Sequence, residues 1–128
     1  MAEKVNYGEA DITAFTQRAS AGEFSFEPDA VRAAVKEIDS YIHELIVSRG
    51  KIASGESASG FGTLPSGMEL QLGFQNKARS AGSAINQLIE GAMQIQEGFL
   101  RSAGLIEDAD SVSARRIALM ASTVEGPQ

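Results

Sequence analysis

One apolar stripe constrains this chain more than any other feature of its sequence. Its members are separated by alternating steps of four and three residues: Phe74, Ala78, Ala81, Ile85, Leu88, Ala92, Ile95 and Phe99. This spacing puts every member on one face of a long helix, as in a seam between packed helices. A second apolar stripe precedes it at Val31, Val35, Ile38, Ile42 and Leu45. The sequence therefore predicts two long helices that pack together.

The length and composition favour one folded domain with tails. The hydrophobic fraction of 43% suits a folded chain rather than a disordered one. The net charge of −6 argues against a nucleic-acid binder, which needs a basic face, and against electrostatic binding to anionic lipid. No stretch reaches the roughly 18 apolar residues that span a bilayer, and the first residues lack the apolar segment of a cleaved secretory signal.

We expect an all-α fold built around an antiparallel two-helix hairpin. In chain order the expected regions are a flexible N-terminal segment, the hairpin and an acidic, largely flexible tail, at residues 1–23, 24–103 and 104–128. The predicted helices are a short one at 11–19 and two long ones at 28–50 and 66–103, with a loop at 51–65.

Local signals support these boundaries. Asp11 suits the N-cap of the short helix, and Pro28 suits the first position of a helix because its missing N–H has no partner there. Ser66 and Glu69 have the spacing of a capping box. Gly50 and Gly104 are natural C-terminal breaks.

The second long helix is the longer of the two, at roughly 55 Å against roughly 35 Å. Its far end therefore extends past the first helix and needs a cover from the 11–19 segment, the tail or another chain. A lone hairpin also buries too little apolar surface to offset the entropy of ordering it. We therefore expect two hairpins, identical or different, to pair into a four-helix bundle. The expected partner-binding residues are Ile85, Leu88, Ile89, Ala92, Met93, Ile95, Phe99 and Leu100.

Two segments resemble a known family. The stretch from Phe24 to Ala34, which reads FSFEPDAVRAA, resembles the opening of small actinobacterial type VII secretion proteins. The hairpin that follows resembles the WXG-motif family, and its bend at Gly60, Phe61 and Gly62 has Phe61 where the family has tryptophan. The resemblance covers about residues 24–103. The family's export signal, Tyr-xxx-Asp/Glu after the second helix, is absent, because no tyrosine follows Tyr41.

The resemblance implies a helical hairpin that pairs with another and is exported without a cleaved signal. Its implied partners are a second hairpin protein, a type VII secretion ATPase or a larger effector. The alternative is a cytoplasmic adaptor or chaperone that shields the helices of such an effector.

We expect no enzymatic activity and no catalytic, cofactor-binding or metal-binding residues. His43 is the only histidine, and one histidine without cysteine partners forms neither a zinc site nor an acid–base couple. The bend lacks the pattern of a phosphate-binding loop. The acidic residues Glu107, Asp108 and Asp110 lack the spacing and glycine of a calcium-binding loop.

Overall fold

The computed structural model describes residues 7–124 of the chain, so residues 1–6 and 125–128 of the two expected flexible ends lie outside it. Within that range the regular elements are all helical, which confirms the all-α prediction. In chain order they are α1 (Glu9–Ser20), α2 (Pro28–Ala53), the short 3₁₀ helix η1 (Ser54–Ser57), α3 (Pro65–Ser102) and α4 (Ile106–Val124).

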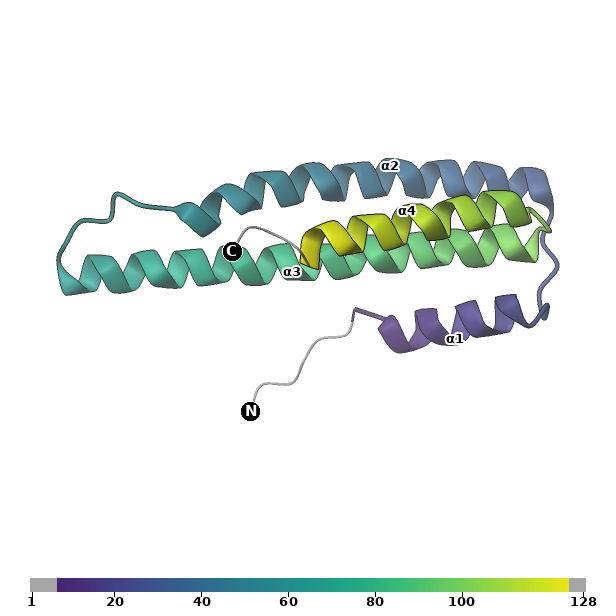
Figure 1. The fold of residues 1–128 in the computed structure, drawn as a ribbon, viewed down its shortest axis with the longest axis horizontal. Coiled ribbons are helices and arrows are strands. Elements are labelled where there is room, and N and C mark those ends of the chain that lie inside the picture. Colours follow the sequence, from purple (N-terminus) through teal and green to yellow (C-terminus); the bar gives the residue numbers. More distant parts are fainter. Residues whose placement is uncertain (1–6, 125–128) are drawn as a thin grey trace.

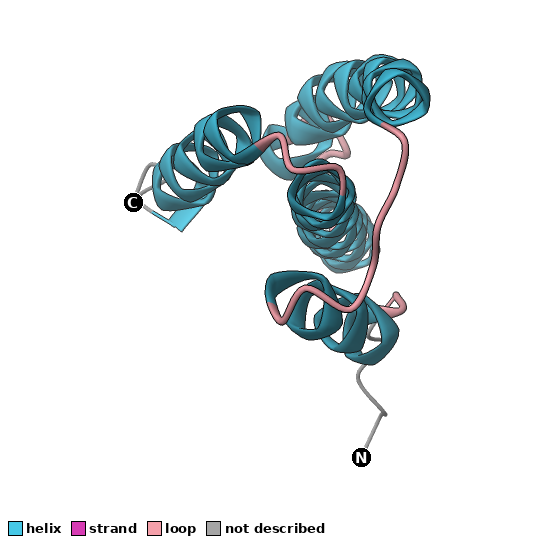
Figure 2. Ribbon diagram, turned by 90° about the vertical axis from the view of Figure 1, so that its right-hand side faces the viewer, coloured by secondary structure: helices cyan, strands magenta, loops and turns pink. Residues whose placement is uncertain are grey.

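Helix α3 lies at the centre of the molecule (Figures 1 and 2). Helices α2 and α4 run antiparallel to it, whereas α1 runs parallel to it (Figure 1). Among the described helices, the backbones of α1, α2 and α4 each approach α3 closely and none of these three approaches another in this way. Helix α2 follows most of α3, but α1 and α4 lie only along its C-terminal half (Figure 1). The two halves of α3 are therefore covered very differently.

Glycines end two of the helices as sharp turns. Gly104 has a φ of 77°, in the left-handed region that suits glycine, and the N–H of Leu105 donates to the carbonyl of Leu100 at 2.8 Å. This Schellman motif confirms Gly104 as the stop of α3 and turns the chain back along it. Gly22, also with a φ of 77°, ends α1 in the same way.

The observed start of one helix matches the sequence-based prediction, and the starts of two others differ from it. Pro28 begins α2, as predicted, and the carboxylate of Glu27 caps it by accepting the N–H of Ala30 at 2.6 Å. The prediction of a capping box at Ser66 and Glu69 is wrong, because α3 begins at Pro65 without a side-chain cap. The N-cap of α1 is Gly8 rather than Asp11.

Helix α2 continues past the predicted stop at Gly50. It runs to Ala53 and leads directly into η1. The irregular connection before α3 is therefore shorter than the loop predicted at 51–65. A glycine inside a helix costs only about 1 kcal/mol, which the packing of α2 along α3 offsets. The extra turns carry the hairpin further along the N-terminal half of α3.

The core lies where α2, α3 and α4 meet. Its buried apolar members are Val31, Ile42, Ile89, Ala92, Met93, Leu100, Ala109 and Val112. Gln96 is fully buried among them, and its amide nitrogen donates to the carbonyl of Val35 at 3.0 Å and to the carboxylate of Asp39 at 2.7 Å. These two bonds fix the position of α2 along α3, because any sliding would leave the buried amide without partners.

The prediction of a largely flexible tail is wrong for residues 106–124, which form α4. Ala109 and Val112 on this helix are almost fully buried against α3. The apolar pattern of the segment is interrupted by Arg116, which falls between Val112 and Leu119 at helical spacing. Arg116 is held by carboxylates of α3, so its position is compatible with a packed face.

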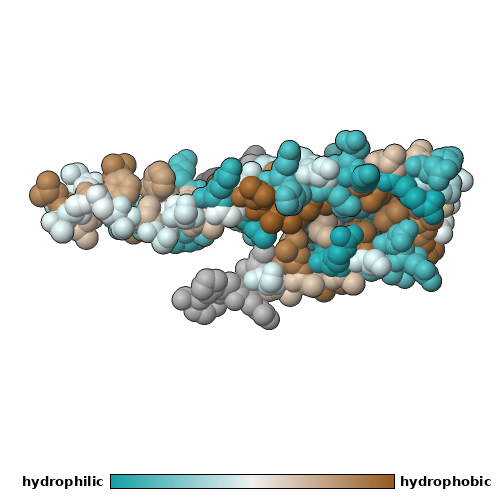
Figure 3. All heavy atoms as spheres, turned by 90° about the horizontal axis from the view of Figure 1, so that it is seen from above, coloured by the Kyte–Doolittle hydropathy of each residue, from teal (hydrophilic) through white to brown (hydrophobic). Residues whose placement is uncertain are grey.

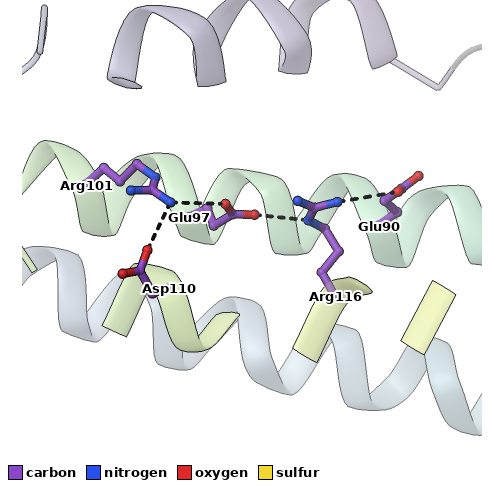
Figure 4. A network of polar contacts seen from close by, with 5 residues as sticks. All are labelled: Glu90, Glu97, Arg101, Asp110 and Arg116. Atoms are coloured by element: carbon purple, nitrogen blue, oxygen red, sulfur yellow. Dashed lines mark hydrogen bonds and ion pairs between the residues drawn. The ribbon is translucent and has the colours of Figure 1, made fainter. Parts of the chain in front are cut away.

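Ion pairs join α4 to α3 around Glu97 (Figure 4). Arg116 lies 3.0 Å from the carboxylate of Glu97 and 3.7 Å from that of Glu90. Arg101 lies 3.7 Å from Glu97 and 3.3 Å from Asp110. The Glu97 side chain is only 13% exposed, so solvent screens these pairs less than it screens an isolated surface pair.

Helix α1 sits in a groove made by two glycines of α3. A Cβ atom on Gly98 would overlap the ring of Phe15, and one on Gly91 would lie 3.0 Å from Cδ1 of Ile12. The Phe15 ring also stacks on Phe24 at 5.5 Å and meets Phe99 edge-on at 5.6 Å between centroids. The absence of side chains at these two positions therefore permits α1 to dock.

Replacing Gly98 with alanine tests this docking. We expect Gly98→Ala to displace Phe15 and α1 and to lower the free energy of unfolding by about 1–3 kcal/mol. Trypsin should then cleave after Arg18 more rapidly in the folded protein. The control is Gly73→Ala, where a Cβ meets no atom within 4 Å and should stabilise α3 by up to about 1 kcal/mol. Equal stabilisation by both substitutions would contradict the docking.

Removing the carboxylate of Glu97 tests the link between α3 and α4. We expect Glu97→Ala to lower the free energy of unfolding by about 1–2 kcal/mol, because two partly buried arginines lose a shared partner. The matched control is Glu23→Ala, which breaks an exposed pair with Arg18 and should cost less than about 0.5 kcal/mol. Urea unfolding measures the free energy of unfolding of both variants. Equal losses in the two variants would contradict a special role of Glu97 in joining α4 to α3.

Candidate interaction surface

Half of the predicted partner-binding residues lie in the core of this chain. Ile89, Ala92, Met93 and Leu100 are at most 7% exposed, because α1, α2 and α4 cover the C-terminal half of α3. The prediction that these four residues bind another chain is therefore corrected. The cover comes from the 11–19 region and the tail, two of the three sources that the helix lengths allow.

The other four predicted residues, Ile85, Leu88, Ile95 and Phe99, are only half-buried. Phe99 meets Phe15 at 5.6 Å and Phe26 at 5.9 Å between ring centroids, and it borders a hollow of about 230 Å³ with residues at the start of α2. This end of the stripe therefore faces the space between α1 and α2. Leu88 and Ile95 belong neither to the buried cluster nor to the apolar side chains packed against it.

The opposite end of the stripe borders a larger hollow. Phe74, Ala78 and Ala81 line it from α3, and its volume is about 440 Å³. We call this hollow the tip groove, and its full lining is Lys51, Ile52, Ser54, Gly55, Ala58, Phe74, Lys77, Ala78 and Ala81. Its two charged lining residues are both lysines. The stripe therefore begins and ends in hollows on the surface of the chain.

The first turns of α3 are apolar on more than the stripe face. Leu64 is 71% exposed and Leu70 is 62% exposed, and three further large apolar side chains are about half exposed, namely Met68, Leu72 and Phe74. Figure 3 shows apolar side chains along this narrow end of the molecule. Only Glu69 is charged between residues 64 and 74. A helix with apolar residues all round is normally buried.

The apolar surface of α3 that the other helices leave exposed lies near its N-terminus, whereas the two helix lengths predicted an overhang at its C-terminus. Helix lengths alone do not show that α1 and α4 fold back onto the C-terminal half. The available signal was the leucines and methionine between residues 64 and 72, which fall outside the heptad stripe. They have no role within a single seam and therefore indicate a second apolar face.

The predicted bend closes the end of the hairpin. Gly60 and Gly62 have φ values of 88° and 90°, which only glycine adopts without strain. The half-buried Phe61 between them lies 6.1 Å from Phe74 between ring centroids. A Cβ on Gly67 would overlap the carbonyl of Phe61, so this glycine permits the loop to lie against α3.

Polar contacts hold the same region together. The amide nitrogen of Gln75 donates to the carbonyl of Ala58 at 2.6 Å, which fixes the loop after η1 on α3. The guanidinium of Arg49 donates to the side-chain oxygen of Asn86 at 2.7 Å, which joins α2 to α3. The tip groove therefore has walls that are tied to each other rather than independent segments.

The remaining candidate residues are not brought together. His43 is exposed on α2, and Glu107, Asp108 and Asp110 are exposed at the start of α4. Within residues 7–124, no group of three or more His, Cys, Asp or Glu side chains is arranged to hold a metal ion. Among the helices that the structure describes, none is long and apolar enough to cross a membrane.

Comparisons of the chain with known protein families, curated proteins and solved structures find no match.

Adding a side chain at Gly55 tests the packing of the tip groove. A Cβ there would lie 2.9 Å from that of Ala78 and 3.2 Å from the ring of Phe74. We expect Gly55→Val to push η1 away from α3 and to lower the free energy of unfolding by about 1–3 kcal/mol. Amide hydrogen exchange should increase at residues 54–64. The control is Gly50→Ala, where the added atom meets open space. Unchanged exchange in Gly55→Val would refute the close packing.

Proposed function

We propose that this chain is a non-enzymatic interaction protein that binds a second helical hairpin along the stripe of α3. The observation that carries the proposal is the state of that stripe. Leu88, Ile95 and Phe99 remain half-buried although three helices already pack on α3. An apolar row at heptad spacing on a helix surface is the usual site of contact with another helix.

The arrangement of α2 and α3 supports a partner that is itself a hairpin. These helices lie side by side and antiparallel (Figure 1), and each contributes residues to the hollows at both ends of the stripe. A two-helix partner laid along this face would complete a bundle of four long helices. Helix α1 lies beside this face at Phe99, so it would border the partner rather than be replaced by it.

We further propose that the chain is a secreted substrate or an export partner of a type VII secretion system. The support is the resemblance of residues 24–34 and of the bend at Gly60, Phe61 and Gly62 to that class of proteins. No tyrosine follows Tyr41 in residues 42–128, and we propose that a partner supplies the export signal. The secretion ATPase and a larger effector are the further proposed partners.

The second candidate is a cytoplasmic adaptor or chaperone that shields a larger effector. The exposed apolar residues at the start of α3 favour it, because they offer a second face on which an effector helix would pack. Secretion separates the two candidates. Tagged protein that reaches the culture medium only when the secretion ATPase is present supports the first, and retention in the cell under both conditions supports the second.

Substitutions on neighbouring residues of α3 separate binding from folding. We expect the double change Leu88→Glu and Ile95→Glu to weaken association with a co-expressed hairpin protein at least about 100-fold, since both side chains lie outside the core. It should lower the free energy of unfolding by less than about 1.5 kcal/mol. Ile89→Asp should instead unfold the chain, because it places a charge at a fully buried site.

Light scattering and circular dichroism measure these outcomes. The proposal is refuted if the helical wild-type protein remains monomeric and binds no hairpin protein co-expressed with it. It is also refuted if the double variant associates as tightly as the wild type.

A further inference from the structure

The shape of the tip groove indicates what it would accept. Its lining includes the small residues Gly55, Ala58, Ala78 and Ala81, and its volume is about 440 Å³. The larger apolar side chains Ile52 and Phe74 also line it. An apolar hollow lined largely by small residues accommodates a large apolar side chain from a partner, as a hole accommodates a knob between packed helices.

The charge around the tip groove is opposite to that of the rest of the chain. Residues 45–84 contain four basic and two acidic residues, whereas the remaining residues contain seven and fifteen. Lys51 and Lys77 line the groove, and within residues 7–124 neither forms an ion pair. These ammonium groups therefore favour an occupant with carboxylates beside its apolar residues.

A second copy of this chain fits the groove poorly. Two tips placed together would bring the same excess of basic residues into contact, which is unfavourable. An antiparallel copy would place the tip groove against the far end of the stripe. That end is also a hollow, of about 230 Å³ between Phe99 and the start of α2. Tip-to-tip pairing therefore sets like charges together, and antiparallel pairing sets one hollow against another.

We propose that the tip groove binds an amphipathic helix of a different protein, which inserts a large apolar residue between glutamate or aspartate side chains. The inference rests on the proposed function and specifies the chemistry of its partner at this end of the stripe. Leu70, which is 62% exposed and lies about one helical turn before Phe74 on α3, extends the apolar contact beyond the groove.

Two synthetic helical peptides of about 20 residues, roughly 30 Å long, test this inference on the full chain. Both carry the same leucine and phenylalanine face, flanked by glutamates in one and by lysines in the other. Fluorescence anisotropy should show that the acidic peptide binds at least tenfold more tightly at low salt, and that the difference shrinks at high salt. Because the chain has a net charge of −6, long-range attraction alone would favour the basic peptide.

Substitutions in the tip groove test whether the groove causes the tighter binding of the acidic peptide. The double change Lys51→Glu and Lys77→Glu should reverse it, and Ala81→Phe, which fills the groove, should weaken acidic-peptide binding at least tenfold. The matched control, Lys36→Glu with Arg115→Glu, alters charge equally beside the hollow between α2 and α4 and should leave the preference unchanged. Circular dichroism verifies that each variant folds, and Phe74→Ala replaces Ala81→Phe if the latter does not.

Several results would overturn the inference: no binding of the acidic peptide, equal or tighter binding of the basic one, or no effect of the lysine reversal. Self-association of the wild type that Ala81→Phe abolishes would assign the groove to a second copy. Binding to phosphatidylserine vesicles that requires the two lysines would assign it to a lipid surface. If a hairpin partner still binds in a manner sensitive to Leu88→Glu and Ile95→Glu, only this inference fails and the proposed function stands.

Discussion

The structure depends on one constraint: helix α3 carries more apolar surface than any single neighbour covers. One row of its residues, including Ile89, Met93 and Leu100, is buried against α2 and α4. The adjoining heptad stripe is divided, because Ala92 belongs to the buried cluster while Leu88, Ile95 and Phe99 are only half-buried. A helix with apolar residues around most of its circumference requires several partners. The chain supplies three of them for the C-terminal half and essentially one, α2, for the N-terminal half.

Each neighbour of α3 is held in register by a different kind of contact. Gln96 positions α2 through two buried hydrogen bonds, Glu97 positions α4 through its arginine partners, and Gly98 provides the space for α1. These three consecutive residues point in different directions because successive residues of a helix are separated by about 100°. A short segment of α3 therefore organises most of the fold, while the apolar side chains of its first turns remain exposed.

Much of the fold was predictable because local signals decide it. Pro28, Gly22 and Gly104 fixed helix ends through backbone geometry that no other residue type provides as well. The fate of the acidic tail was not predictable in this way, because Arg116 interrupts its apolar pattern and becomes compatible with packing only when Glu97 lies opposite. The candidate site was likewise only half predicted, because burial of Ile89 or Met93 depends on segments distant in sequence.

By itself, the sequence determined the helical class, the long hairpin and the face of α3 that carries the stripe. These follow from residue spacing and from turn residues, which act over a few positions along the chain. Only the tertiary structure decided which apolar residues become core and which remain exposed. That division depends on where α1 and α4 fold back, and both cover the C-terminal half of α3. The exposed apolar surface consequently lies at the tip, beside Phe74, with two lysines at its groove.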